Sequence, residues 1–171
     1  MDIVDCILAD HDRQRRWFAA LDEARDDLES AGKIFNRLRD HLEAHAMAEE
    51  KYFYPTLLQL GEGALDSDSA DETTEDAIDD HNKIANAADA ALNEEVGSDA
   101  WWKCVDKANY QNSAHLSEEE RQGLTDFRRR VPLERRIALG IKYLAFEADH
   151  VTNVEREEKD PDAYIEENEA A

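Results

Sequence analysis

Apolar residues recur every three or four positions through most of this chain, and that period limits its fold more than any other feature. A period near 3.6 residues gathers apolar side chains on one face and predicts amphipathic helices. Only 6 Gly and 3 Pro occur among 171 residues. This scarcity of turn-forming residues favours a few long helices over a many-stranded sheet. We therefore predict an all-α chain.

Four long helices joined by short links predict an up-down-up-down four-helix bundle over residues 1–130. An additional helix is expected over 131–156, packing alongside, with an acidic, flexible tail over 157–171. The apolar stripe of this additional helix includes Leu133, Ile137, Ile141 and Leu144. The predicted helical segments are 3–31, closed by Gly32; 33–60, bent by Pro55; 73–96, capped by Thr73 or Thr74; 98–122, capped by Ser98 or Asp99 and broken at Gly123; and a last one starting at Val131-Pro132.

Charge and composition exclude several classes of partner. The net charge of −22, from 42 acidic and 20 basic residues, argues against nucleic acid and against anionic membrane surfaces. No apolar run approaches the roughly 20 residues that a membrane span needs. Early aspartates interrupt any signal peptide, and two distant cysteines suit reduced thiols, so we expect a cytoplasmic protein. The acidity fits either a high-salt source or simple solubility, and it indicates no function.

Four histidines carry the chemical information. His11, His45, His81 and His115 lie one per predicted helix, on the inward stripe, at spacings of 34, 36 and 34 residues. In an antiparallel bundle of near-equal helices, this regularity returns each histidine to a similar height. The four side chains are therefore expected to converge on one layer of the core.

Two glutamates repeat with these histidines. His45 with Glu49, and His115 with Glu119, both form H-x-x-x-E, a spacing that puts both side chains on one helix face. Imidazole nitrogen with carboxylate oxygen suits iron, and also Mn or Zn. The set is sufficient for two metal ions, each with two imidazoles and with the carboxylates between them. Core histidines hydrogen-bonded to carboxylates without metal form the simpler alternative, which the repeated pattern disfavours.

Around these residues the chain resembles the hemerythrin-like proteins, also called the HHE cation-binding domain. The resemblance spans about residues 3–130. It rests on DHDRQR, HAMAEEKYFYP, DDHNKI and HLSEEE around the candidate ligands. It implies a non-haem di-iron centre in a four-helix bundle, with two Fe ions in oxo- or hydroxo-bridged form. The terminal ligands would be His11, His45, His81 and His115, and Glu49 and Glu119 would bridge.

The sequence also departs from the oxygen-carrying members of that family. Those proteins place a second histidine one turn from the first on the third helix, whereas here Ala77 and Ala85 flank His81. One ligand fewer implies an open position on one iron. That favours peroxide turnover, O₂ or NO sensing, or iron handling over reversible O₂ carriage.

Two functional hypotheses follow from the resemblance. The first is a scavenger or enzyme that consumes O₂, peroxide or NO. The second is an O₂- or iron-sensing module, or an iron store, that signals through a protein partner on helix 133–156. The absence of an attached output domain favours scavenging or storage, and the oligomeric state stays open.

Several other residues near the array receive predicted roles. His41, one turn before His45, is either a supporting or extra ligand or, more simply, a hydrogen-bonded interface histidine. Glu50 and Glu118 are expected to support the ligands or to face solvent, and His150 to lie on the surface. Core packing without a redox role is predicted for Trp101, Trp102, Tyr52, Phe53 and Tyr54.

Overall fold

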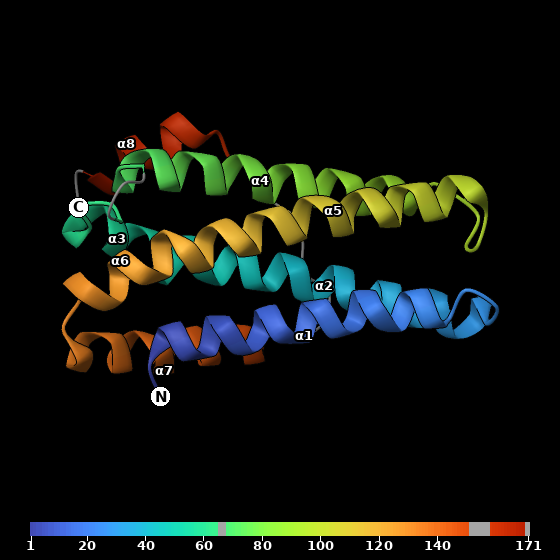
Figure 1. The fold of residues 1–171 in the computed structure, drawn as a ribbon, viewed down its shortest axis with the longest axis horizontal. Coiled ribbons are helices and arrows are strands. Elements are labelled where there is room, and N and C mark those ends of the chain that lie inside the picture. The colour runs from blue at the N-terminus through green and yellow to red at the C-terminus, as the bar shows by residue number, and fades with distance from the viewer. Residues whose placement is uncertain (65–67, 151–157, 170–171) are drawn as a thin grey trace.

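The computed structural model describes residues 1–64, 68–150 and 158–169, and within these ranges the regular structure is all helical. Four long helices form the predicted antiparallel bundle, and they alternate in direction along its axis (Figure 1). The bundle helices are α1 (Ile3–Glu23), α2 (Leu28–Tyr52), α4 (Ala70–Ala91) and α5 (Asp99–Arg121). No helix in these ranges is both long and apolar enough to cross a membrane.

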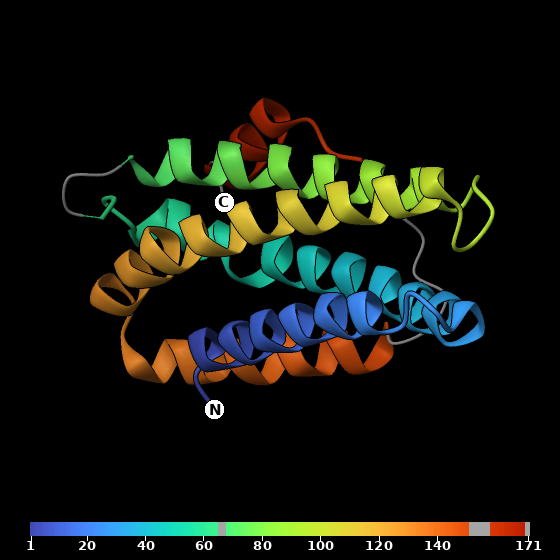
Figure 2. The same ribbon diagram turned by 45° about the vertical axis from the view of Figure 1, so that its right-hand side comes forward.

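Short helices complete the bundle and two C-terminal helices cover it. After α2 and α5 the chain breaks at Phe53 and Gln122 and continues as α3 (Tyr54–Leu60) and α6 (Gly123–Arg130). Helix α7 (Leu133–Asp149) packs on α1 and α2, and α8 (Pro161–Glu169) packs on α4 and α3 (Figure 2). The predicted bundle with an additional C-terminal helix is confirmed.

The first helical boundary was predicted wrongly. Helix α1 ends at Glu23, and Gly32 lies inside α2 instead of closing the first helix. The side chain of Asp27 accepts a hydrogen bond from the backbone N–H of Ser30 (3.1 Å) and so starts α2. A capping aspartate satisfies a free N–H of the first turn, which a glycine cannot do with its side chain.

The start of α4 was also misplaced. Ser69 caps this helix, because its hydroxyl accepts from the Glu72 N–H while the Glu72 carboxylate accepts from the Ser69 N–H. This reciprocal pair places the start of the helix ahead of Thr73 and Thr74. Ser98 caps α5 through the Trp101 N–H, as predicted.

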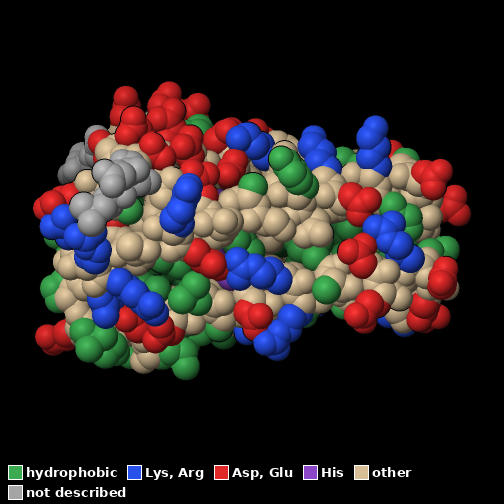
Figure 3. Space-filling model, in the orientation of Figure 1, with side chains coloured by type: hydrophobic (Ala, Val, Ile, Leu, Met, Phe, Trp, Pro, Cys, Tyr) green, Lys and Arg blue, Asp and Glu red, His purple; other side chains and the backbone are tan. Residues whose placement is uncertain are grey.

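Helix α7 uses a different face from the one expected. Leu133, Ile137, Ile141 and Leu144 are exposed, whereas Gly140, Tyr143 and Phe146 are buried. A Cβ at position 140 would lie 2.4 Å from the Met1 carbonyl oxygen, so glycine is what lets α7 approach the start of α1. Figure 3 shows apolar side chains on the molecular surface over α7.

The acidic segment 157–171 is not uniformly frayed. It contains α8, whose Tyr164 is buried and whose hydroxyl donates to the carbonyl oxygen of Glu50. Its acidic side chains gather on the surface over α8 (Figure 3). The predicted continuation of the additional helix through 151–156, and the tail residues 157, 170 and 171, lie outside the described residues.

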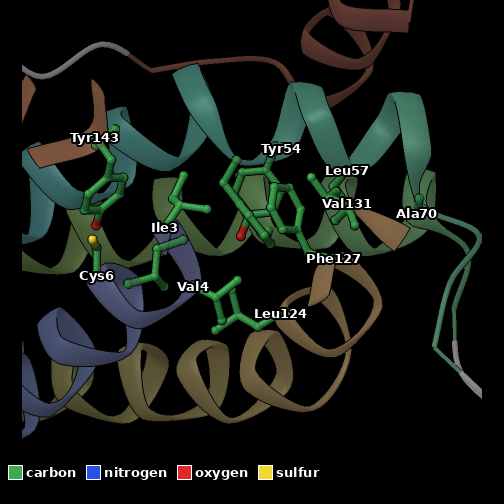
Figure 4. Close-up of a cluster of buried hydrophobic side chains, with 14 of the residues drawn as sticks. Ile3, Val4, Cys6, Tyr54, Leu57, Ala70, Leu124, Phe127, Val131 and Tyr143 are labelled. Atoms are coloured by element: carbon green, nitrogen blue, oxygen red, sulfur yellow. The ribbon is translucent and has the colours of Figure 1, made fainter. Parts of the chain in front are cut away.

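The apolar core forms two clusters separated by the histidine layer. One cluster includes Ile3, Ile7, Tyr54, Phe127 and Tyr143, of which several are drawn in Figure 4. The other includes Phe18, Phe35, Leu38, Trp101 and Trp102. In α1, α2 and α4 the histidine lies between residues of the two clusters, and His115 lies between the second-cluster residues of α5 and the first-cluster residues of α6. Apolar packing on both sides therefore fixes the height of the layer.

Candidate metal centre

The bundle brings all six predicted ligands together in its interior. Each side chain is buried, and none exceeds 7% exposure. The helical period supplies this convergence, because each histidine lies on the stripe that faces the bundle axis. The six residues are His11 on α1, His45 and Glu49 on α2, His81 on α4, and His115 and Glu119 on α5.

The first group of candidate ligands joins α1 and α2. His11, His45 and Glu49 offer ligand atoms that all lie within 4.8 Å of one another. Glu49 Oε1 lies 3.1 Å from His45 Nε2 and 3.8 Å from His11 Nε2. Glu119 Oε2 approaches the same group, at 3.1 Å from His11 Nε2.

The second group joins α4 and α5. His81, His115 and Glu49 also offer ligand atoms within 4.8 Å of one another. Glu49 Oε2 lies 3.4 Å from His81 Nε2, and the Nε2 atoms of His81 and His115 are 3.2 Å apart. Glu49 therefore directs one carboxylate oxygen to each histidine pair.

Buried atoms without partners test whether a metal would fit. Five side-chain atoms that point into the centre make no hydrogen bond of acceptable geometry within the described residues. Polar atoms buried in this way cost free energy unless something binds them. All five are nitrogen or oxygen atoms that suit a transition metal: His11 Nε2, His45 Nε2, Glu49 Oε1, Glu49 Oε2 and Glu119 Oε2.

The outer nitrogens of three histidines are held by protein groups. His11 Nδ1 lies 3.0 Å from Glu120 Oε1, and His81 Nδ1 lies 2.9 Å from Glu50 Oε1. Such carboxylates fix the ring and leave Nε2 as the metal-binding atom. Glu50 thus supports a candidate ligand, one of the two roles expected for it, whereas Glu120 was not singled out from the sequence.

Tyr143 supports the third histidine from α7. Its hydroxyl lies 2.7 Å from His45 Nδ1 and donates to Asp10 Oδ2 at 3.1 Å. Because the hydroxyl has one proton, His45 Nδ1–H donates to Tyr143, which leaves the Nε2 lone pair facing Glu49. The additional helix therefore contacts the candidate centre directly.

Tyr54 contacts the candidate centre as well as the core. It packs in the core as predicted, but its hydroxyl also donates to Glu119 Oε1 at 2.5 Å. Burial and the neighbouring carboxylates hold the pKa of Tyr54 well above its usual value, so the phenol stays a donor. It thereby orients one of the two candidate bridging carboxylates.

The remaining predicted positions lie outside the two histidine groups. Glu118 is about half-buried, and its carboxylate accepts a hydrogen bond from the Gln122 side chain. His150 is half-buried at the end of α7, where its ring stacks on Phe146. His41 is buried, with Nε2 at 3.8 Å from Asp10 Oδ1, so it belongs to a different cluster.

A cavity opens beside the second group. It has a volume of about 400 Å³ and is lined by His45, His81 and His115 together with Ala85 and Asn112. A larger side chain at position 85 would enter this space, since Ala85 follows His81 by one helical turn. Of the two alanines one turn from His81, Ala85 lines this cavity and Ala77 does not.

Without metal, burial and charge divide the four imidazoles into two kinds. Burial and the nearby charge of His81 lower the pKa of His115 to about 3. Burial also acts on His81, but its contacts with the Glu49 and Glu50 carboxylates outweigh it and raise that pKa to about 10. His45 behaves like His115, and His11 like His81. Two of the imidazoles thus act as cations that neutralise the buried carboxylates.

His115 and His81 should make the stability of the metal-free protein depend on pH in opposite directions below and above pH 6.5. Between the unfolded pKa of 6.5 and about 3 the unfolded chain binds more protons at His115, so stability falls as the pH falls. Between 6.5 and about 10 the folded chain binds more protons at His81, so stability falls as the pH rises. Urea denaturation of the metal-free protein across this range measures both limbs. His81→Gln should reduce the loss of stability between pH 6.5 and about 10. An unchanged loss would contradict its assignment to His81.

Comparison with known proteins agrees with the geometry. A family model described as the hemerythrin HHE cation binding domain matches residues 2–126, a range that contains all six candidate ligands. Searches of curated proteins and of solved structures gave no match. The matched range covers most of the chain and ends inside α6. The chain therefore belongs to the hemerythrin family of HHE cation-binding domains.

Proposed function

We propose that the centre holds two iron ions and binds or reacts with O₂, peroxide or NO. The observation that carries this proposal is the position of Glu49, whose two oxygens face two separate histidine pairs. A carboxylate placed in this way suits a bridge between two ions better than a ligand to one. Two bound iron ions would supply redox chemistry toward these small oxidants.

The donor set favours iron over zinc. Each histidine pair offers two imidazole nitrogens and one oxygen of the Glu49 carboxylate. This donor set suits Fe, with Mn or Zn as alternatives. Structural zinc sites are usually closed and often include cysteine. Neither Cys6 nor Cys104 belongs to the two groups.

The chain's own residues would act by orientation and access. Glu120, Tyr143 and Glu50 hold outer histidine nitrogens, so the rings keep their direction when a small molecule enters. The cavity beside His81 and His115 gives such a molecule a place to bind. This access supports reaction or sensing over reversible O₂ carriage.

Ala85→Leu tests the role of the cavity. The added side chain should fill space beside His81 without replacing a candidate ligand, so metal content should stay unchanged. The rate of reaction of the iron-loaded protein with peroxide or NO, followed by stopped-flow absorbance, should fall at least about tenfold, equivalent to an added barrier of about 1.4 kcal/mol.

Asn86→Leu is the matched control, because residue 86 is the next position on α4, is exposed and does not line this cavity. It should react at the wild-type rate. If Ala85→Leu also reacts at that rate, the cavity is not the route of access.

A sensing module is the second candidate. Tyr143 links α7 to His45, so a change at the centre could reach the helix that carries the exposed stripe Leu133, Ile137, Ile141 and Leu144. A protein partner on that stripe is part of this alternative. Hydrogen exchange of α7 that differs between the oxidised and reduced iron protein would favour sensing, and identical exchange would favour scavenging.

A further inference from the structure

A second cluster of metal-binding side chains lies outside the two histidine pairs. Asp10 on α1, His41 on α2 and Glu147 on α7 offer ligand atoms that all lie within 4.8 Å of one another. Asp10 and His41 are 2% and 5% exposed, and Glu147 is partly buried. These three groups are not among the six candidate ligands of the proposed di-iron centre. They also do not line the cavity beside it.

Unpartnered atoms point into this cluster. Within the described residues, His41 Nε2 and Glu147 Oε1 are buried without a hydrogen bond. His41 Nε2 lies 3.8 Å from Asp10 Oδ1, which is too long for a hydrogen bond. This distance between the two atoms is close to the separation of two ligand atoms on one tetrahedral metal ion. That separation is about 3.4 Å when each metal–ligand bond is about 2.1 Å. A small cation bound in this cluster would give His41 Nε2 and Glu147 Oε1 the partner that each lacks.

The cluster is reachable and already attracts positive charge. A cavity of about 200 Å³ is lined by His41 and Glu147 together with Arg13, Arg37 and Asp40. Arg13 Nη1 lies 2.8 Å from Asp10 Oδ1, and its side chain is half exposed. This guanidinium can leave the cluster toward solvent. Arg37 lies over the ring of Trp17, with its guanidinium carbon 5.8 Å from the ring centroid.

We propose that Asp10, His41 and Glu147 form a separate site for one divalent transition-metal cation. One imidazole nitrogen and two carboxylates suit Zn²⁺, Mn²⁺ or Fe²⁺. The cation would replace the Arg13 guanidinium at Asp10 Oδ1. It would also balance the two carboxylates that α1 and α7 bring together in the interior.

This site adjoins the di-iron centre. The other Asp10 oxygen, Oδ2, accepts from the Tyr143 hydroxyl, which in turn contacts His45 Nδ1. Figure 4 shows the Tyr143 hydroxyl directed toward α1 near Cys6, one turn before Asp10. Burial, with the charge of Asp10, raises the pKa of Cys6 to about 11, so the thiol stays protonated. A cation on Asp10 would lie one hydroxyl group away from a candidate iron ligand.

Zinc stoichiometry tests the proposal on the full chain. The protein is saturated with Zn²⁺, desalted in about 0.5 M NaCl to screen surface charges, and analysed for bound metal. His41→Ala and Glu147→Gln should each bind about one Zn²⁺ per chain less than wild type. Arg13→Gln should keep the wild-type count and bind this Zn²⁺ several-fold more tightly, because the competing guanidinium is gone.

His150→Ala is the matched control, since it removes a histidine next to α7 that lies outside the cluster. It should bind as much Zn²⁺ as wild type. Circular dichroism checks that His41→Ala folds, and Glu147→Gln keeps the test valid if it does not. Equal Zn²⁺ counts in wild type, His41→Ala and Glu147→Gln would overturn the proposal. If the di-iron proposal is wrong, wild type and all the variants should bind less Zn²⁺ per chain. The difference of about one Zn²⁺ between wild type and the two cluster variants should remain.

Discussion

Glu49→Gln is expected to remove both metal ions. The carboxamide keeps the shape of the side chain but offers one neutral oxygen where the carboxylate directs one charged oxygen to each histidine pair. Losing the shared ligand should therefore empty both positions, while replacing a terminal ligand would affect one. Metal analysis of the purified, iron-reconstituted variant measures this directly.

The same substitution should also destabilise the metal-free fold. Burial and the charge of Glu119 raise the pKa of Glu49, but its oxygens lie 3.4 Å from His81 Nε2 and 3.8 Å from His11 Nε2, the two imidazoles whose pKa is raised. Removing one partner of a buried ion pair leaves the other charge uncompensated. Metal-free Glu49→Gln should therefore unfold at a lower urea concentration than the metal-free wild type.

Glu50→Gln is the matched control for Glu49→Gln. Glu50 is the next residue and is also buried, but it contacts the outer nitrogen of His81 and pairs with Lys159. Its replacement should weaken metal binding by about 10–100-fold without abolishing it. If Glu49→Gln retains two ions, Glu49 does not bridge and the assignment of the ligands is wrong.

Trp101→Ala is expected to give the largest loss of stability without loss of metal binding. Trp101 is 1% exposed and packs edge-on against Phe35 and Trp102, with ring centroids 5.2 and 4.5 Å away. Truncating a fully buried tryptophan removes apolar burial and leaves a cavity, at a cost of about 3–5 kcal/mol in the free energy of unfolding. Urea denaturation measures this cost.

Tyr110→Ala on the same helix provides the comparison. Tyr110 is 77% exposed, so its truncation should change the free energy of unfolding by no more than about 0.5 kcal/mol. Both folded variants should keep the wild-type metal content. Metal loss in folded Trp101→Ala would show that the second apolar cluster and the centre are not separable.

The sequence predicted what depends on helical period. The spacing of His11, His45, His81 and His115, and the two H-x-x-x-E pairs, are local patterns that a regular bundle converts into one layer. The bundle therefore followed from periodicity, and the convergence of the candidate ligands followed from the bundle.

Contacts between elements distant in sequence could not be predicted in this way. The pairs Tyr143–His45 and Tyr54–Glu119 depend on how α7 and α3 pack, and no local pattern encodes that packing. The face of α7 was mistaken because the larger apolar residues outweighed Gly140, whose lack of a Cβ is what permits close approach. A glycine within an amphipathic helix was the available signal.

Metal content per chain, read together with the visible spectrum in air, tests the central claim most directly. The account predicts about two irons per chain with the absorption of an oxo-bridged pair, in line with two histidine pairs that share Glu49. A single metal, zinc alone, or no metal after careful reconstitution would contradict the di-iron centre, and the bundle would then need another role.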